Sequence, residues 1–281
     1  MIIRTVQKSY LKTCTYHRLS HGIRTWVSTS CGAWFDPEVI LRTLNLPDDA
    51  LIKKGTSRRS RVTKVFRSDH DGRPMLFKTF DFVKYKDIYC HAKYLRRYPS
   101  ALSEFYNSHR ARLLDISVPE NYAYFEMRSW TGVKKCGVVQ EFIENSRDFS
   151  VVYKSKEEQF RNVTSILVLL YKKGVNHIDI SPQNILVNRE TQKKTVIDWQ
   201  YCSFHEPCNE NQLILHATKY LGYLEIGHKD MLWKKWLTEL HRQSSLQMDL
   251  DVFLRKVKSL EGKKLRLEFR LNLDPDGLGI E

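Results

Sequence analysis

The sequence predicts an α+β protein of two lobes, a small β-rich lobe over residues 45–143 and a mainly helical lobe over residues 144–281. Alternating apolar residues and turn signals are typical of the first stretch, whereas apolar residues spaced three and four apart are typical of the second. At 281 residues, the chain is long enough to bury a sizeable core. Residues 1–44 form an N-terminal extension that we expect to be either an extra strand or a cap on the substrate side.

Five strands and one helix are expected in the first lobe. The strands fall at residues 51–54, 62–67, 74–80, 121–130 and 137–143. A turn over Gly55–Ser60 joins the first two strands, and Asp71-Gly72 gives a hairpin signal between the second and the third. The helix lies around Glu104, between the third and fourth strands. The first lobe is therefore predicted to be a sheet with one helix.

The second lobe contains helical patterns on both sides of a polar loop. Phe160, Val163, Leu167 and Leu170 recur at helical spacing, and Gly174 is a plausible end for that helix. Two further amphipathic helices are expected near the C-terminus, and each has four apolar residues. These are Trp233, Trp236, Leu237 and Leu240 in one, and Leu250, Phe253, Leu254 and Val257 in the other. We expect their apolar faces to pack on the core rather than on a membrane.

The polar loop carries the pattern His177-x-Asp179-x-x-x-x-Asn184, and Asp198 follows a short hairpin. In phosphoryl transfer, an Asp accepts the proton of the attacking hydroxyl, and an Asn and a second Asp hold Mg²⁺ ions on the nucleotide phosphates. We expect Asp179 to be the catalytic base, Asn184 and Asp198 to be metal ligands, and His177 to be structural. An ordinary buried loop, with Asp179 as a cap, is the alternative; the combined spacing and strand context favour the catalytic interpretation.

Nucleotide-binding groups are expected upstream of that loop. Lys78, on the third strand, is placed to reach the nucleotide phosphates, and Glu104 to pair with Lys78. The turn that begins at Gly55 is expected to cover the phosphates, although it has one glycine in place of Gly-x-Gly-x-x-Gly. Backbone groups around Glu141 and Ile143 are expected to contact the adenine edge. For Lys78, the alternative is a plain surface lysine.

Charge indicates an acidic partner. The net charge is +14 and the pI is about 9.4, values that suit nucleic acid, an anionic membrane surface or a phosphorylated substrate. No recognised nucleic-acid motif is present, so we expect no nucleic-acid partner. The first eight residues lack the apolar core of a secretory signal, and the run Ile166–Leu170 is far shorter than a membrane span. We therefore expect a cytoplasmic protein.

Together, these residues resemble the bacterial lipopolysaccharide core kinases, the heptose and Kdo kinase family. The resemblance covers roughly residues 50–205 and rests on Lys54–Val62, Lys78, Glu104, Val118-Pro119-Glu120, His177 to Asn184, and Ile197-Asp198. It implies a two-lobed protein-kinase-like fold. Trp199-Gln200 stands where protein kinases have Phe-Gly after the metal-binding Asp, which argues against the usual activation-loop switch.

The resemblance also implies a function. Family members transfer the γ-phosphate of ATP to a sugar hydroxyl of the lipopolysaccharide inner core, at the cytoplasmic face of the inner membrane. The implied cofactors are ATP and Mg²⁺. The implied partners are a phosphorylated glycolipid and, peripherally, the anionic inner-membrane surface. Within the family pattern, Asp179 corresponds to the base, Asn184 and Asp198 to the Mg²⁺ ligands, and Lys78 to the ATP-phosphate ligand.

Three alternatives remain open. A protein kinase is less favoured because no Ala-Pro-Glu follows Asp198. A small-molecule kinase for an aminoglycoside or choline is less favoured because a cationic substrate calls for an acidic lobe. A pseudokinase or nucleic-acid-binding protein is less favoured because Lys78, Asp179, Asn184 and Asp198 are all intact.

Overall fold

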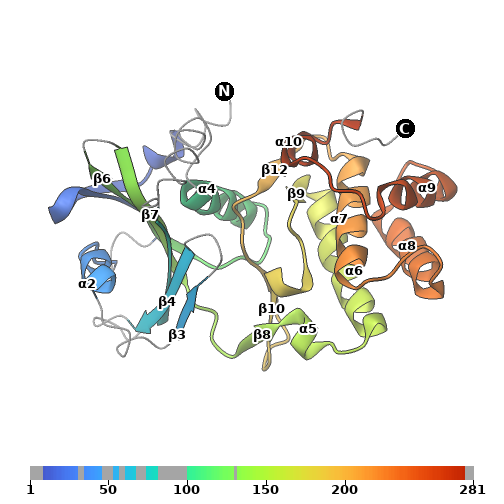
Figure 1. Ribbon diagram of the computed structural model, residues 1–281, viewed down its shortest axis with the longest axis horizontal. Helices are drawn as coiled ribbons and strands as arrows, with labels where there is room; N and C mark the ends of the chain where they lie inside the picture. Colours follow the sequence, from blue (N-terminus) through green and yellow to red (C-terminus); the bar gives the residue numbers. More distant parts are fainter. Residues whose placement is uncertain are drawn as a thin grey trace. The chain divides into compact units, whose positions relative to one another are not determined.

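A computed structural model describes residues 9–30, 35–45, 53–56, 61–67, 74–81, 100–129 and 132–275 (Figure 1). The chain divides into two compact units. One comprises Met1–Arg110 and Pro119–Glu144, and the other comprises Ala111–Val118 and Asn145–Glu281. Each unit has its own buried apolar clusters.

The described strands of the first unit form one antiparallel sheet in the order β1-β2-β6-β7-β5-β4-β3. Their bounds are β1 Thr15–Arg18, β2 Ile23–Val27, β3 Lys53–Thr56, β4 Arg61–Arg67, β5 Pro74–Asp81, β6 Asn121–Ser129 and β7 Gly132–Glu141. The strands expected around 62–67, 74–80, 121–130 and 137–143 are thus present. The N-terminal extension supplies β1 and β2, which continue the sheet beyond β6.

Gly55 differs from its predicted position. It lies inside β3, opposite Thr63 of β4, rather than at the start of a turn. The strand extends to Thr56 because the backbone pairing continues past the glycine. The connection is therefore shorter than predicted, and its residues 57–60 lie outside the described part of the chain.

Both faces of this sheet are covered, because successive side chains of a strand point to opposite faces. On β6, Ala123 and Phe125 belong to one apolar cluster and Tyr124 to the other. Helix α2 (Val39–Asn45) contributes Val39 and Ile40 to the first cluster. Helix α4 (Ser100–Leu113) contributes to the second cluster through Ala101, Leu102 and Phe105. The packing of α4 fixes where its polar side chains lie on the sheet.

The second unit is mainly helical. Its helices are α5 Phe149–Val152, α6 Lys156–Lys172, α7 Glu210–Tyr223, α8 Met231–Ser244, α9 Leu250–Leu260 and α10 Leu267–Asn272. Helix α6 begins with a capping box, in which Ser155 and Glu158 bond each other's backbone N–H. The chain leaves α6 at Gly174, whose φ of +62° suits a residue without a side chain. The helix end predicted at this glycine is confirmed.

One core holds these helices together. Helix α6 packs on α7 and α8, and α9 packs on α7 and α8, as Figure 1 shows for these labelled helices. The apolar residues predicted for α6, α8 and α9 are in this core, except Leu250, which packs against it half-buried. The preference for core packing is therefore confirmed. Within the described residues, no helix is long and apolar enough to cross a membrane.

Short strands frame the polar loop of this unit. They are β8 Ser146–Asp148, β9 Val175–His177, β10 Ile185–Asn188, β11 Lys194–Val196 and β12 Cys202–Phe204. Strands β10 and β11 form the predicted hairpin, with Ile185 opposite Val196. Strand β9, before the loop, pairs with β12. After the loop, the chain enters β10 through a 3-10 turn, Pro182–Asn184. The loop is thus anchored at both ends.

Candidate active site

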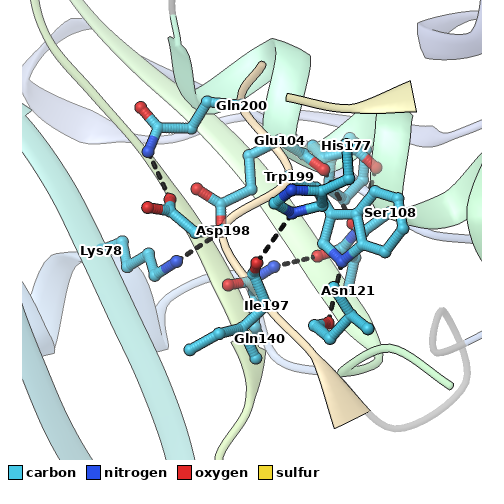
Figure 2. Close-up of polar contacts among 12 residues, drawn as sticks. Lys78, Glu104, Ser108, Asn121, Gln140, His177, Ile197, Asp198, Trp199 and Gln200 are labelled. Carbon is cyan, nitrogen blue, oxygen red and sulfur yellow. Dashed lines mark hydrogen bonds and ion pairs between the residues drawn. The ribbon is translucent and has the colours of Figure 1, made fainter. Parts of the chain in front are cut away.

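The first unit contains a buried ion pair between Lys78 and Glu104 (Figure 2). Lys78 lies in the middle of β5, between Thr63 of β4 and Val138 of β7. Its Nζ is 2.5 Å from Oε1 of Glu104 on α4, and the two side chains are 9% and 1% exposed. The structure therefore contains the pairing expected from the sequence, and Lys78 is not a plain surface lysine.

A polar network holds α4 in register with the sheet. Asn121 of β6 donates from Nδ2 to the carbonyl of Phe105 at 2.8 Å and also to the hydroxyl of Ser108. Gln140 of β7 donates to Oδ1 of Asn121 at 2.6 Å. Ser108 in turn donates to the carbonyl of Glu104 at 2.7 Å. Because hydrogen bonds form only within a narrow range of distances and angles, this chain of contacts fixes the helix turn that carries Glu104.

The predicted adenine-contacting segment follows β7. The amide of Glu141 donates to the carbonyl of Glu120 at 2.8 Å, and the amide of Phe142 donates to that of Pro74 at 3.3 Å. Among the described residues, no acceptor is present for the amide of Ile143. Of the backbone N–H groups proposed for the base edge, the one at Ile143 is therefore the best placed to donate to a ligand.

In the second unit, Asp179 and Asn184 are tied together across the polar loop. Asn184 donates from Nδ2 to the carbonyl of Asp179 at 2.8 Å. The amide of Ile180 donates to the carbonyl of His177 at 3.1 Å, which tightens the turn on which Asp179 lies. Asp179 is only partly buried. The loop therefore fixes the backbone of Asp179 and leaves its carboxylate accessible.

His177 connects this loop to the segment before Asp198. Its Nε2 lies 3.0 Å from the carbonyl of Ile197, and its ring meets that of Trp199 edge-on at 4.9 Å (Figure 2). Burial lowers the pKa of His177, so the ring is neutral and donates to that carbonyl from Nε2. The amide of Ile197 donates to the carbonyl of Asn184 at 2.9 Å. These bonds agree with the structural role expected for His177.

Asp198 has a backbone conformation that is uncommon outside glycine, with φ of +67°. Asp and Asn tolerate this left-handed region better than most residues, and such conformations concentrate at functional sites. Its Oδ1 accepts a hydrogen bond from Nε2 of Gln200 (Figure 2). Gln200 therefore orients the carboxylate, a role that the sequence pattern did not assign to it.

The donor set fits a magnesium ion that also binds phosphate. Nδ2 of Asn184 donates to the loop, so the side-chain oxygens that these two residues can offer to a metal ion are Oδ1 of Asn184 and the carboxylate of Asp198. Mg²⁺ takes one or two such protein oxygens and completes its shell with water and phosphate oxygens. Among the described residues, no group of three or more His, Cys, Asp or Glu side chains is suited to a metal ion.

Two cations beside Asp179 were not identified from the sequence. Lys219 of α7 places Nζ 3.4 Å from Oδ1 of Asp179 and 4.8 Å from the centre of the Tyr223 ring. Arg270 of α10 donates to the carbonyl of Ile178. Burial lowers the pKa of Arg270, and Asp179 opposes that shift. Both cations lie beyond residue 205, where the sequence resemblance ends, so the motifs that predicted the site did not include them.

Comparisons with known proteins agree with this geometry. Residues 49–212 match the model of the lipopolysaccharide kinase (Kdo/WaaP) family. A probable casein kinase II subunit alpha homolog of Encephalitozoon cuniculi is 25% identical over 172 residues, which are 58% of this chain and 47% of the relative. The chain thus spans about half the length of that curated relative.

A solved structure described as WaaP in complex with acyl carrier protein also matches. The TM-score is 0.52 and the identity 17%, over 86% of this chain and 97% of the other. This likeness shows the fold: a small, sheet-rich lobe and a mainly helical lobe, as in protein kinases. The fold class predicted from the sequence is confirmed.

Proposed function

The chain belongs to the lipopolysaccharide kinase (Kdo/WaaP) family, and we propose on that premise that it transfers the γ-phosphate of ATP to a sugar hydroxyl of the lipopolysaccharide inner core. The acceptor sugar is heptose or Kdo. The observation that carries the proposal is the hydrogen bonding of the polar loop. Asn184 donates to the backbone carbonyl of Asp179, and the amide of Ile197, the residue before Asp198, donates to the carbonyl of Asn184. A base and two metal ligands on one braced unit are what phosphoryl transfer needs.

In this mechanism, the carboxylate of Asp179 accepts a hydrogen bond from the acceptor hydroxyl, orients it for in-line attack and takes its proton. The partly exposed position of Asp179 suits contact with a substrate. Lys78, held by Glu104 at 2.5 Å, binds the ATP phosphates and offsets the charge that develops on them. Glu104 acts through Lys78 and is a positioning residue.

Asn184 and Asp198 are the residues that we propose to hold Mg²⁺. When bound, the ion neutralises phosphate charge during transfer. Gln200 keeps the Asp198 carboxylate oriented, and His177 keeps the segment before Asp198 attached to the loop. The backbone around Glu141 and Ile143 contacts adenine, and Gly55 of strand β3 contributes to phosphate binding.

Charge supports an anionic acceptor. A net charge of +14 suits a phosphorylated glycolipid at an anionic membrane surface. We propose a peripheral association with the cytoplasmic face of the inner membrane, which brings the loop close to an acceptor whose lipid part stays in the bilayer.

The test is transfer of ³²P from Mg-ATP to lipopolysaccharide, both dephosphorylated and untreated, with Asp179→Asn beside the wild type. Asp251→Asn, the same change at an exposed residue of α9, is the matched control. We expect label on the glycolipid with the wild type and the control. Asp179→Asn should lose most of it while still binding ATP. Full activity of Asp179→Asn would overturn the assignment of the base.

The same assay tests the alternatives. The similarity to a probable casein kinase II subunit alpha homolog makes a protein acceptor the second candidate. Label on added peptide, but none on glycolipid, would establish a protein kinase. Label only on small polyols or aminoglycosides would indicate a small-molecule kinase. ATP binding without transfer to any acceptor would indicate a pseudokinase.

A further inference from the structure

The second unit has a pocket of about 410 Å³ beside Asp179. Helix α7 forms one wall and the connection from α9 to α10 forms another. Its lining contains four cations, Lys219, Lys263, Lys264 and Arg270, and, within the described part of the chain, no Asp or Glu. Leucines and Tyr223 supply the apolar part of the lining. The pocket therefore combines apolar walls with a concentration of positive charge.

These four cations have different surroundings. Arg270 is partly buried and donates one hydrogen bond to the carbonyl of Ile178; a guanidinium has five N–H donors, so others remain for a ligand. Lys263 and Lys264 are exposed at the rim. Cations gathered in a concave, low-dielectric site focus the field and attract anions. Carboxylate and phosphate groups are the oxyanions that Arg and Lys bind best.

Lys219 links this pocket to the catalytic loop. It lines the pocket, and its Nζ lies 3.4 Å from Oδ1 of Asp179. In the proposed mechanism, the acceptor hydroxyl lies against Asp179. A group attached to the same acceptor, close to that hydroxyl, therefore reaches the pocket past Lys219.

We propose that this pocket binds an oxyanion of the acceptor, a carboxylate or a phosphate carried near the hydroxyl that is phosphorylated. This inference rests on the proposed function and goes beyond it, because it states which chemical feature the acceptor must have. Lys263, Lys264 and Arg270 contact the oxyanion, and Lys219 lies between it and the reacting hydroxyl. A sugar without a charged group close to the hydroxyl is therefore a poor acceptor.

The first test removes charge at the rim. The variant Lys263→Gln/Lys264→Gln is compared with Lys234→Gln/Lys235→Gln, which removes the same charge from two exposed lysines of α8 outside the pocket. We expect the pocket variant to raise the acceptor KM roughly tenfold or more, since a charge-assisted bond is lost. Its KM for ATP and its ATP hydrolysis without acceptor should stay at wild-type values. The α8 variant should match the wild type throughout.

Two acceptor pairs identify the oxyanion. The first is the methyl glycoside of Kdo and its carboxyl-reduced form; the second is heptose with and without a phosphate on a neighbouring hydroxyl. With the wild type, removal of the recognised oxyanion should raise KM as much as the lysine changes do. With the pocket variant, it should have little further effect. Loss at the first pair assigns a carboxylate, and loss at the second assigns a phosphate.

A second variant fills the pocket without a change of charge. Gly222 of α7 lines it, and a Cβ at this position meets no atom within 4 Å, so Gly222→Leu adds bulk at the pocket wall. It should also raise the acceptor KM and leave the KM for ATP unchanged. If both variants keep the wild-type acceptor KM, the inference is overturned, while transfer to glycolipid leaves the proposed function intact.

If the wild type transfers phosphate to no lipopolysaccharide acceptor, the proposed function fails, and the pocket is then tested with inorganic phosphate. Chemical shifts in α7 should move on titration of the wild type and of the α8 variant, and should not move in Lys263→Gln/Lys264→Gln. Equal responses in all three proteins, or no response in any, would overturn the oxyanion site.

Discussion

Substitution of Glu104 by glutamine should strongly destabilise the first unit, although it keeps the size of the side chain. Lys78 and Glu104 are 9% and 1% exposed in their side chains, so the change removes the negative charge that lies 2.5 Å from a buried ammonium. Loss of one partner of a buried pair costs about 3–5 kcal/mol. We therefore expect a loss of that order in the free energy of opening of β5 and α4.

A second ion pair with the same N···O distance but exposed side chains serves as the control for burial. Glu239 and Arg242 of α8 are also joined at 2.5 Å, but their side chains are 44% and 71% exposed. Ion pairs in water contribute little, so Glu239→Gln should leave stability unchanged within error. The double variant Lys78→Met/Glu104→Met should recover most of the stability lost in Glu104→Gln, because both charges of the buried pair are then replaced by apolar side chains. It should remain inactive, since the lysine proposed to bind the ATP phosphates is absent.

Hydrogen exchange followed by mass spectrometry is the suitable assay, because a chain of two units does not unfold in one transition. A loss of about 3–5 kcal/mol speeds exchange in β5 and α4 by about a hundredfold to a few thousandfold. Exchange in Glu104→Gln no faster than in Glu239→Gln would refute the electrostatic reasoning. A double variant as unstable as the single one would refute it as well.

Three further predictions concern single positions. Gly137→Ala should cost about 1–3 kcal/mol by overpacking, because a Cβ there overlaps the ring of Phe125 and the carbonyl of Lys78; hydrogen exchange in β5 and β7 as slow as in the wild type would contradict this. Asn184→Ala should lower kcat and raise the Mg²⁺ concentration for half-maximal rate, since it removes a proposed metal ligand and a brace on the loop; an unchanged Mg²⁺ titration would argue against the ligand role. Burial lowers the pKa of His216 to about 3, so the unfolded chain takes up a proton near pH 6.5 that the folded chain does not. Stability of the second unit should therefore fall as pH drops below about 6.5, by up to ~1.4 kcal/mol per unit. The slope should be smaller in His216→Leu, and identical slopes would exclude His216 as the cause.

Local patterns predicted the parts of the site that local chemistry determines. The spacing from Asp179 to Asn184 fits a single loop, and the bond that joins these residues spans five positions. Helix α6 has an apolar face that the sequence displays directly. The pairing of Lys78 with Glu104 was predicted from the expected order of strand and helix, because the helical segment offers no other close Glu. In each case, the relevant residues are close in the sequence or follow a known order of elements.

Long-range contacts account for what was missed. Arg270 and the carbonyl of Ile178 that it contacts are 92 residues apart in the sequence, and no local pattern in the short α10 predicts that contact. Lys219 has the appearance of an ordinary surface residue of a helix until α7 is placed beside the loop. The extension of β3 through Gly55 depends on its pairing with β4, which outweighed the tendency of glycine to mark a turn.

The two N-terminal strands have a consequence for the solubility of the protein. Without β1 and β2, the nine-residue strand β6 would be the last in its sheet and would expose a long row of unpaired backbone groups. Long exposed edges invite pairing between molecules, and natural proteins end their sheets with short or covered strands. Here the sheet ends at β1, which has four residues. A variant that lacks residues 1–27 should therefore aggregate through β6, even though every proposed catalytic side chain is retained.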